Sequence, residues 1–334
     1  HYVQEPGGFY EAQMTPNMNV MAEVTPISIQ PTTTGSYILD MGQNMVGWLQ
    51  IRVKGNAGDK ITLRFAESLK SDGTLYRDNL RDAKSTDTYI LKGQGEEVWE
   101  PKFVYHGFRF VELSGFNSKP SLEDFKGKMV YDDIKTVGSF ESSDATLNHI
   151  FKNAFWGISG NYKGMPVDCP QRNERQPWLG DRTTGAYGES FLFDNQTLYA
   201  KWLEDIKNAQ TPDGAIPDVA PAYFRYYGDN VTWPGTYITV ADMLYQQYAD
   251  KKVIEKHYPS MKKWLLYMES NYLVDNLLTK DTYGDWCVPP ESLELIHSKD
   301  PARTTNGELI ASAYYYHLLQ IMKKFASLTE QPNS

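Results

Sequence analysis

Short stretches in the first part of the chain alternate apolar and polar side chains. This period of two is typical of strands with one face in solvent. The clearest alternating stretches lie at residues 51–53, 61–65 and 108–113, and turn sequences rich in Gly, Asn and Asp lie between them at 54–59, 71–73 and 92–95. Such turns join antiparallel strands. We therefore predict an antiparallel β-sandwich over residues 21–134, preceded by an irregular lead-in at 1–20.

After about residue 135 the apolar positions recur every three or four residues, which indicates helices. Ser142 and Ser143 offer an N-cap, and Asp144 suits a first helical turn. Residues 135–142 are therefore predicted to be a linker and 143–334 a helical domain. One helix starts at the cap, and five more are expected at about 183–194, 196–209, 237–250, 253–273 and 307–328.

The predicted helices are joined by connections of uneven length. The stretches 210–236 and 280–305 are long and rich in aromatic residues and Asp-Gly or Pro-Gly turns. Long loops in compact domains are often functional. Short and long connections that alternate between paired helices predict an α/α toroid with the long loops at one rim.

The composition and charge of the chain exclude some classes of binding partner. The chain has 33 basic and 42 acidic residues and no basic run, so nucleic acid is not a predicted partner. No apolar stretch reaches the length of a membrane span. With 41% hydrophobic residues, 334 residues suffice for two cores. The many aromatic residues suit both sugar stacking and large helical cores.

The two cysteines are Cys169 and Cys287, too few for a disulfide framework, although a single bridge between them is compatible with the sequence. The chain opens at His1 and carries no leader, which is typical of a processed chain or an excised piece. A periplasmic or extracellular location is favoured over a cytoplasmic one. Oligomeric state is not predicted.

Residues 168–181, DCPQRNERQPWLGD, hold most of the candidate chemistry. Two prolines forbid a regular helix, so the stretch is a shaped loop. Its three acids repel one another, which raises the pKa of the least solvated one, and glycoside hydrolysis needs an acid that stays protonated. The two arginines oppose this effect. From spacing alone, a structural ion-pair loop is an equally good interpretation.

This loop closely resembles the signature of bacterial α-L-rhamnosidases, which reads Asp-Cys-Pro-x-Arg-Asp/Asn-Glu-Arg followed by Trp-x-Gly-Asp. The resemblance implies that Glu174 is the general acid of an inverting hydrolase. It also implies that terminal rhamnose is held by the residues matching its binding positions: Asp168, Arg172, Trp178 and Asp181. Gln176-Pro177 replaces a more usual Leu-Gly.

Four stretches of the first half resemble the β-sandwich domain that precedes the catalytic barrel in the same family: 40–48, 65–67, 87–89 and 105–111. The resemblance thus implies a multidomain β + α fold, an antiparallel β-sandwich followed by an incomplete (α/α)6 barrel. The polar residues in these stretches are expected to fix the sheet by buried hydrogen bonds rather than to act in catalysis: Asp40, Gln43, Glu67 and His106.

The aromatic loops add Trp233, Asp285 and Trp286 as predicted substrate-binding residues, since indole faces suit the 6-deoxy sugar. Asp229 is a weaker candidate, because Pro-Gly and not Gly-Asp follows Trp233.

An inverting hydrolase also needs a second carboxylate. The resemblance places it late in the barrel and no match is present, so the 334 residues alone are expected to be inactive.

No metal site or cofactor is predicted. The histidines and cysteines lack the spacing of zinc ligands, and no dinucleotide, phosphate-binding or Gly-x-Ser-x-Gly motif occurs. Asp-rich loops can bind calcium, but no ligand series is present, so calcium is not predicted.

The predicted function of the full-length protein is therefore hydrolysis of terminal α-L-rhamnose from glycans or glycosides by two carboxylates. Two alternatives remain open: an α/α-barrel glycosidase with another sugar specificity, and a carbohydrate-binding protein that has lost catalysis.

Overall fold

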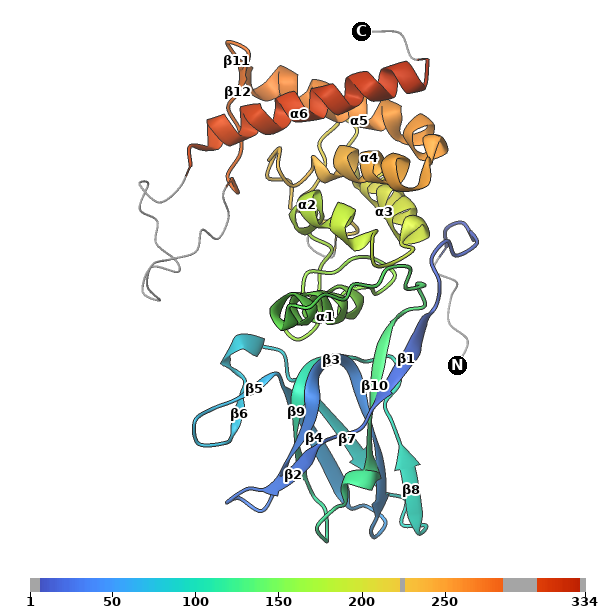
Figure 1. Ribbon diagram of the computed structural model, residues 1–334, viewed down its shortest axis with the longest axis vertical. Helices are drawn as coiled ribbons and strands as arrows, with labels where there is room; N and C mark the ends of the chain where they lie inside the picture. Colours follow the sequence, from blue (N-terminus) through green and yellow to red (C-terminus); the bar gives the residue numbers. More distant parts are fainter. Residues whose placement is uncertain (1–6, 223–225, 285–304, 331–334) are drawn as a thin grey trace.

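The structure is a computed structural model and describes residues 7–222, 226–284 and 305–330. Strands form the first part of the chain and helices the second (Figure 1). The strand β10 ends at Asp132, and the helix α1 begins at Ala145. The predicted order of a β region followed by an α region is confirmed.

Eight strands form one antiparallel sheet with the order β1-β10-β3-β9-β4-β7, and β2 and β8 also pair with β3. Two further strands, β5 and β6, form a separate antiparallel pair. The strands of the β region are β1 (Met18–Val24), β2 (Ser28–Pro31), β3 (Tyr37–Lys54), β4 (Lys60–Ala66), β5 (Ser68–Leu69), β6 (Leu75–Tyr76), β7 (Thr86–Ile90), β8 (Glu96–Trp99), β9 (His106–Ser114) and β10 (Phe125–Asp132). In the helical part, β11 (Leu273–Val274) and β12 (Leu277–Leu278) form a short antiparallel pair.

The sheet curls because β3 changes partners along its 18 residues. Its first part pairs with β2 and β9, and its last part with β10 and β8. The register with β9 shifts between Asp40 and Met45, and such irregularities bend a strand. Hydrogen bonding therefore joins the strands into one curled sheet, where the sequence predicted a two-layered sandwich.

The strands β3 and β10 approach most closely at Gly47. A side chain there would place its Cβ 1.8 Å from the carbonyl oxygen of Lys128. Only glycine fits this position, where the backbone of β10 comes close.

Of the four polar residues expected to fix the sheet by buried hydrogen bonds, only His106 is fully buried. The His106 ring stacks on Phe65 with centroids 4.2 Å apart, and its Nε2 lies 3.0 Å from Asp87. Asp40 is half-buried and accepts two hydrogen bonds from Arg109, of 2.8 and 2.9 Å. Gln43 and Glu67 are also half-buried.

The described helices are α1 (Ala145–Gly160), α2 (Gly180–Glu189), α3 (Gln196–Ala209), α4 (Thr236–Tyr248), α5 (Lys251–Tyr272) and α6 (Gly307–Leu328). The prediction of six helices agrees with this part of the chain, although α2 starts and ends earlier than predicted. After Glu189 the chain turns, and Phe193 pairs with Thr136 in an isolated β-bridge, so Leu192 and Phe193 join the sheet core without extending the helix, while Phe191 is exposed.

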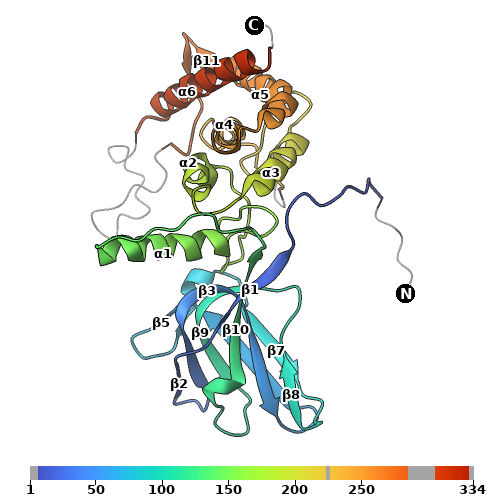
Figure 2. The same ribbon diagram turned by 45° about the vertical axis from the view of Figure 1, so that its right-hand side comes forward.

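The helix α1 lies between the end of the sheet and the other helices (Figures 1 and 2). Its Phe155 stacks on Phe193 with centroids 5.3 Å apart and packs against the sheet core. The helix α4 is central in the second core, because every residue from Thr236 to Leu244 is buried. A helix that is apolar on all sides is expected at such a place.

Candidate active site

The predicted signature loop lies between α1 and α2 and is closed by its own backbone. The Asp168 N–H donates to the carbonyl of Gln176 over 2.9 Å, and the Gln176 N–H donates back to the Asp168 carboxylate over 2.6 Å. Arg175 turns the chain with a φ of 54°. The loop is irregular, as its prolines predicted, and its shape is fixed before any ligand binds.

Glu174 is the point where donors from two regions of the protein converge. Its Oε2 accepts from Arg172 Nε and Arg81 Nη1, each over 2.9 Å. Its Oε1 accepts from the indole N–H of Trp178 over 3.0 Å. Only 17% of the side chain is exposed. The carboxyl group is therefore held in one orientation, as a group that exchanges a proton at a defined place must be.

Asp168 shares Arg172 with Glu174. Its Oδ2 lies 3.5 Å from Arg172 Nη2 and accepts no hydrogen bond from any residue in the described part of the chain. Burial raises the pKa of the Asp168 carboxyl, and the charge of Glu174 adds to the effect. This oxygen is buried and faces the guanidinium group of Arg172.

Cys169 lies in the same cluster. Its sulfur and oxygens of Asp168 and Glu174 all lie within 4.8 Å of one another. Burial, assisted by Asp168, raises the pKa of the Cys169 thiol to about 12. A metal ligand or nucleophile must be a thiolate, so this thiol is prepared for neither role. Cys287, with which a single bridge is compatible in the sequence, lies outside the described residues.

Asp181 occupies the first turn of α2 and is exposed. Protein atoms nevertheless crowd around it, and this desolvation raises the pKa of its carboxyl; the charges of Asp168 and Glu174 act in the same direction, whereas Arg182 opposes them.

Aromatic residues border the loop on one side. Trp178 stacks on Tyr226 with ring centroids 5.3 Å apart. Trp233 stacks on Tyr283 at 4.2 Å and packs against Gly180 at the start of α2. The structure thus brings the predicted Trp233 beside the signature loop, while the predicted Asp285 and Trp286 lie outside the described residues.

Asp229 and Asp218, two acids of the long loop 210–236, accept hydrogen bonds from tyrosine hydroxyls. Asp229 accepts hydrogen bonds from the hydroxyls of Tyr267, at 3.2 Å, and Tyr272, so it is anchored to α5. Asp218 is only 1% exposed, lies next to the β-bridge between Trp178 and Val219, and accepts from the Tyr283 hydroxyl over 3.1 Å. Burial raises the pKa of Asp218 to about 6.

Arg81 and Asp218 carry no distinguishing signal in the sequence. Arg81 lies 93 positions before Glu174, in a turn of the β region. Asp218 follows a proline in a loop with several other acids. The aromatic character of that loop was the only indication that it borders a site.

The close packing of Trp233 on Gly180 gives a prediction. A Cβ at position 180 would lie 2.1 Å from the indole ring, so Gly180→Ala must displace Trp233 or the start of α2. We expect the free energy of unfolding to fall by about 1–3 kcal/mol, measured by urea denaturation.

The matched control for this substitution is Gly188→Ala in the same helix, where a Cβ would meet nothing within 4 Å. It should leave stability unchanged or raise it by up to about 1 kcal/mol. Equal effects of the two substitutions would show that the contact with Trp233 is unimportant.

The chain matches two family models. The bacterial alpha-L-rhamnosidase 6 hairpin glycosidase domain matches residues 135–334, and the bacterial alpha-L-rhamnosidase concanavalin-like domain matches residues 30–131. A curated alpha-L-rhamnosidase from Streptomyces avermitilis is 38% identical over 317 residues, which are 95% of this chain and 29% of that protein.

Solved structures of high similarity to this chain are also alpha-L-rhamnosidases. The alpha-L-rhamnosidase from Dictyoglumus thermophilum has a TM-score of 0.92 and 38% identity over 98% of this chain and 36% of its own. The Streptomyces avermitilis alpha-L-rhamnosidase complexed with L-rhamnose has a TM-score of 0.89 and 37% identity over 96% of this chain and 30% of its own. The chain therefore spans about a third of the length of these relatives.

None of the helices in the described ranges combines the length and apolar character that crossing a membrane requires.

Proposed function

Because the chain belongs to the bacterial α-L-rhamnosidase family, we propose that the protein containing it hydrolyses terminal α-L-rhamnose from glycans or glycosides. The observation that carries this proposal is the arrangement at Glu174, a half-buried carboxyl group fixed by Arg172, Arg81 and Trp178 beside two further acids. A relative has been solved with L-rhamnose bound.

In this proposal Glu174 is the general acid. It protonates the glycosidic oxygen as the bond to the anomeric carbon breaks, while a second carboxylate takes a proton from the attacking water. The carboxyl groups of Asp168 and Asp181 accept hydrogen bonds from sugar hydroxyls. Arg172 orients both Asp168 and Glu174, and Trp178 and Trp233 form the apolar wall for the ring and its methyl group.

Asp168 is a poor candidate for the second carboxylate. Its oxygens approach those of Glu174 within 4.8 Å, whereas inverting enzymes separate the two groups by roughly 6.5–9.5 Å. Arg172 also forms ion pairs with both acids. The guanidinium group of Arg172, and not a sugar ring, therefore bridges the two carboxyl groups. We propose that residues outside this chain supply the base, late in an (α/α)6 barrel of which α1 to α6 form the first part.

The test is an assay of the full-length gene product on 4-nitrophenyl α-L-rhamnoside and on the same aglycone linked to other sugars. We expect selective release of rhamnose, with the β anomer appearing first in proton NMR, because single displacement inverts the anomeric carbon. The 334-residue chain assayed alongside should release none. Release of another sugar, or of the α anomer first, would contradict the proposal.

A further inference from the structure

The β region supplies one of the groups that hold Glu174. Arg81 Nη1 lies 2.9 Å from Glu174 Oε2 and forms an ion pair across the junction between the β and α regions. The Arg81 side chain is 57% exposed, although its partner is largely buried. The more exposed of the two guanidinium groups that bind this acid therefore comes from the β region.

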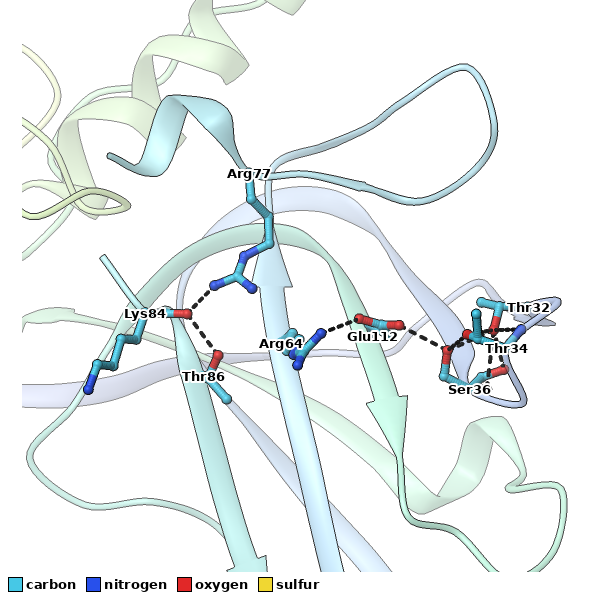
Figure 3. Close-up of polar contacts among 8 residues, drawn as sticks. All are labelled: Thr32, Thr34, Ser36, Arg64, Arg77, Lys84, Thr86 and Glu112. Carbon is cyan, nitrogen blue, oxygen red and sulfur yellow. Dashed lines mark hydrogen bonds and ion pairs between the residues drawn. The ribbon is translucent and has the colours of Figure 1, made fainter. Parts of the chain in front are cut away.

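The turn that carries Arg81 is firmly anchored, so this contact has a rigid base. Leu80 is fully buried, and Asn79 donates to Glu67 over 3.2 Å. Arg77 donates to the carbonyl of Lys84, which ties the two ends of the turn together (Figure 3). On the other side of the junction, Asn173 of the signature loop donates to Asp82 over 3.3 Å.

The backbone at Arg81 is strained. Its φ of 54° and ψ of −125° lie outside the regions that residues with a Cβ normally adopt. Such conformations persist where the surroundings impose them, and they cluster at ligand sites. Glycine would adopt this conformation without the strain.

The three donors to Glu174 are not equivalent. Arg172 and Trp178 come from the same loop as the acid, and Arg172 also pairs with Asp168. Arg81 is the donor that solvent reaches most freely, with 57% of its side chain exposed against 32% for Arg172. A leaving group that takes the proton of Glu174 must approach from an open side, and Arg81 borders that side.

Resting on the proposed role of Glu174 as general acid, we propose that Arg81 is a substrate-binding residue of the leaving-group subsite. Its guanidinium pairs with Glu174 in the free protein and donates hydrogen bonds to the hydroxyl groups of the leaving sugar in the complex. Five N–H donors in a fixed plane allow it to keep Glu174 and bind a hydroxyl together. The preferred substrates are then rhamnosides of a second sugar rather than of an apolar alcohol.

The experiment compares the full-length gene product with its Arg81→Ala and Arg81→Gly variants on two substrates. One is a disaccharide of rhamnose linked to glucose, and the other is phenyl α-L-rhamnoside, whose leaving group has no hydroxyl besides the one that is released. Both substrates lose the contact that orients Glu174, but only the disaccharide also loses the hydrogen bonds to its leaving sugar, so we expect its kcat/KM to fall about tenfold or more beyond the loss seen with the phenyl substrate. Glycine removes the backbone strain, so Arg81→Gly keeps the test available if Arg81→Ala folds poorly.

Arg64→Ala is the matched control, because Arg64 forms an ion pair with Glu112 on the same sheet, away from the site (Figure 3). With 54% of its side chain exposed it resembles Arg81, and its removal should leave the substrate ratio unchanged. An equal loss on both substrates in the Arg81 variants, or no loss, would overturn the leaving-group role while leaving the proposed function intact. If the unmodified protein hydrolyses neither rhamnoside, the proposed function itself fails.

Discussion

Glu174→Gln is expected to lower kcat of the full-length protein on rhamnosides of simple alcohols or sugars by about 10²- to 10⁴-fold, the usual contribution of a general acid. Glutamine keeps the shape of the side chain, and its amide oxygen can still face Arg172 and Arg81. It cannot give a proton to the glycosidic oxygen. Binding of free rhamnose should change little, because the proton is needed only as the bond breaks.

The measurement that separates this role from a structural one is a series of aryl rhamnosides with leaving groups of decreasing basicity. A leaving group such as 2,4-dinitrophenolate needs no proton, so Glu174→Gln should lose much less activity with it. Glu112→Gln, which alters an ion-paired acid on β9, serves as control and should behave like the unmodified protein. A loss that is the same for every leaving group would contradict the assignment of Glu174.

Arg182→Met is expected to have the largest effect on stability. Arg182 Nε lies 3.4 Å from Glu189 Oε1, and its Nη2 donates to the carbonyl of Val167 over 3.1 Å. Both side chains are buried. Removing the arginine leaves a buried carboxylate without its cation, and breaking such a pair costs about 3–5 kcal/mol of unfolding free energy.

The hydroxyls of Tyr162 and Tyr199 cannot replace the lost cation. Both donate to Glu189 Oε2, and burial raises the pKa of each phenol well above its usual value, so both remain neutral donors. Urea denaturation followed by circular dichroism gives the unfolding free energy.

The control for Arg182→Met is Lys251→Met, which removes the cation of an ion pair with Glu255 at 3.4 Å on the surface of α5. Exposed pairs of this kind contribute at most about 1 kcal/mol. If the two substitutions destabilise the protein equally, the cluster around Glu189 is not a buried ion pair in energetic terms.

The positions of the helices and the irregular loop could be predicted because local rules decide them. The apolar stripe predicted α1, but its N-cap is Asp144, whose carboxylate accepts from Thr146 N–H over 2.7 Å, and not Ser142 or Ser143 as predicted. The prolines at 170 and 177 excluded a helix from the signature loop. Of its residues, Asp168, Arg172, Glu174 and Trp178 lie in direct contact in the structure, because a short loop keeps neighbours in sequence close in space.

By itself, then, the sequence determined the β-then-α order, the helix positions and a family signature, since periodicity, capping and proline geometry act over a few residues. Only the tertiary structure decided that β3 pairs on both sides to curl one sheet, that Asp218 is buried beside Trp178, and that Arg81 reaches Glu174 from 93 positions away. These contacts depend on how distant segments pack together, and the residues that make them resemble ordinary surface or loop residues in the sequence.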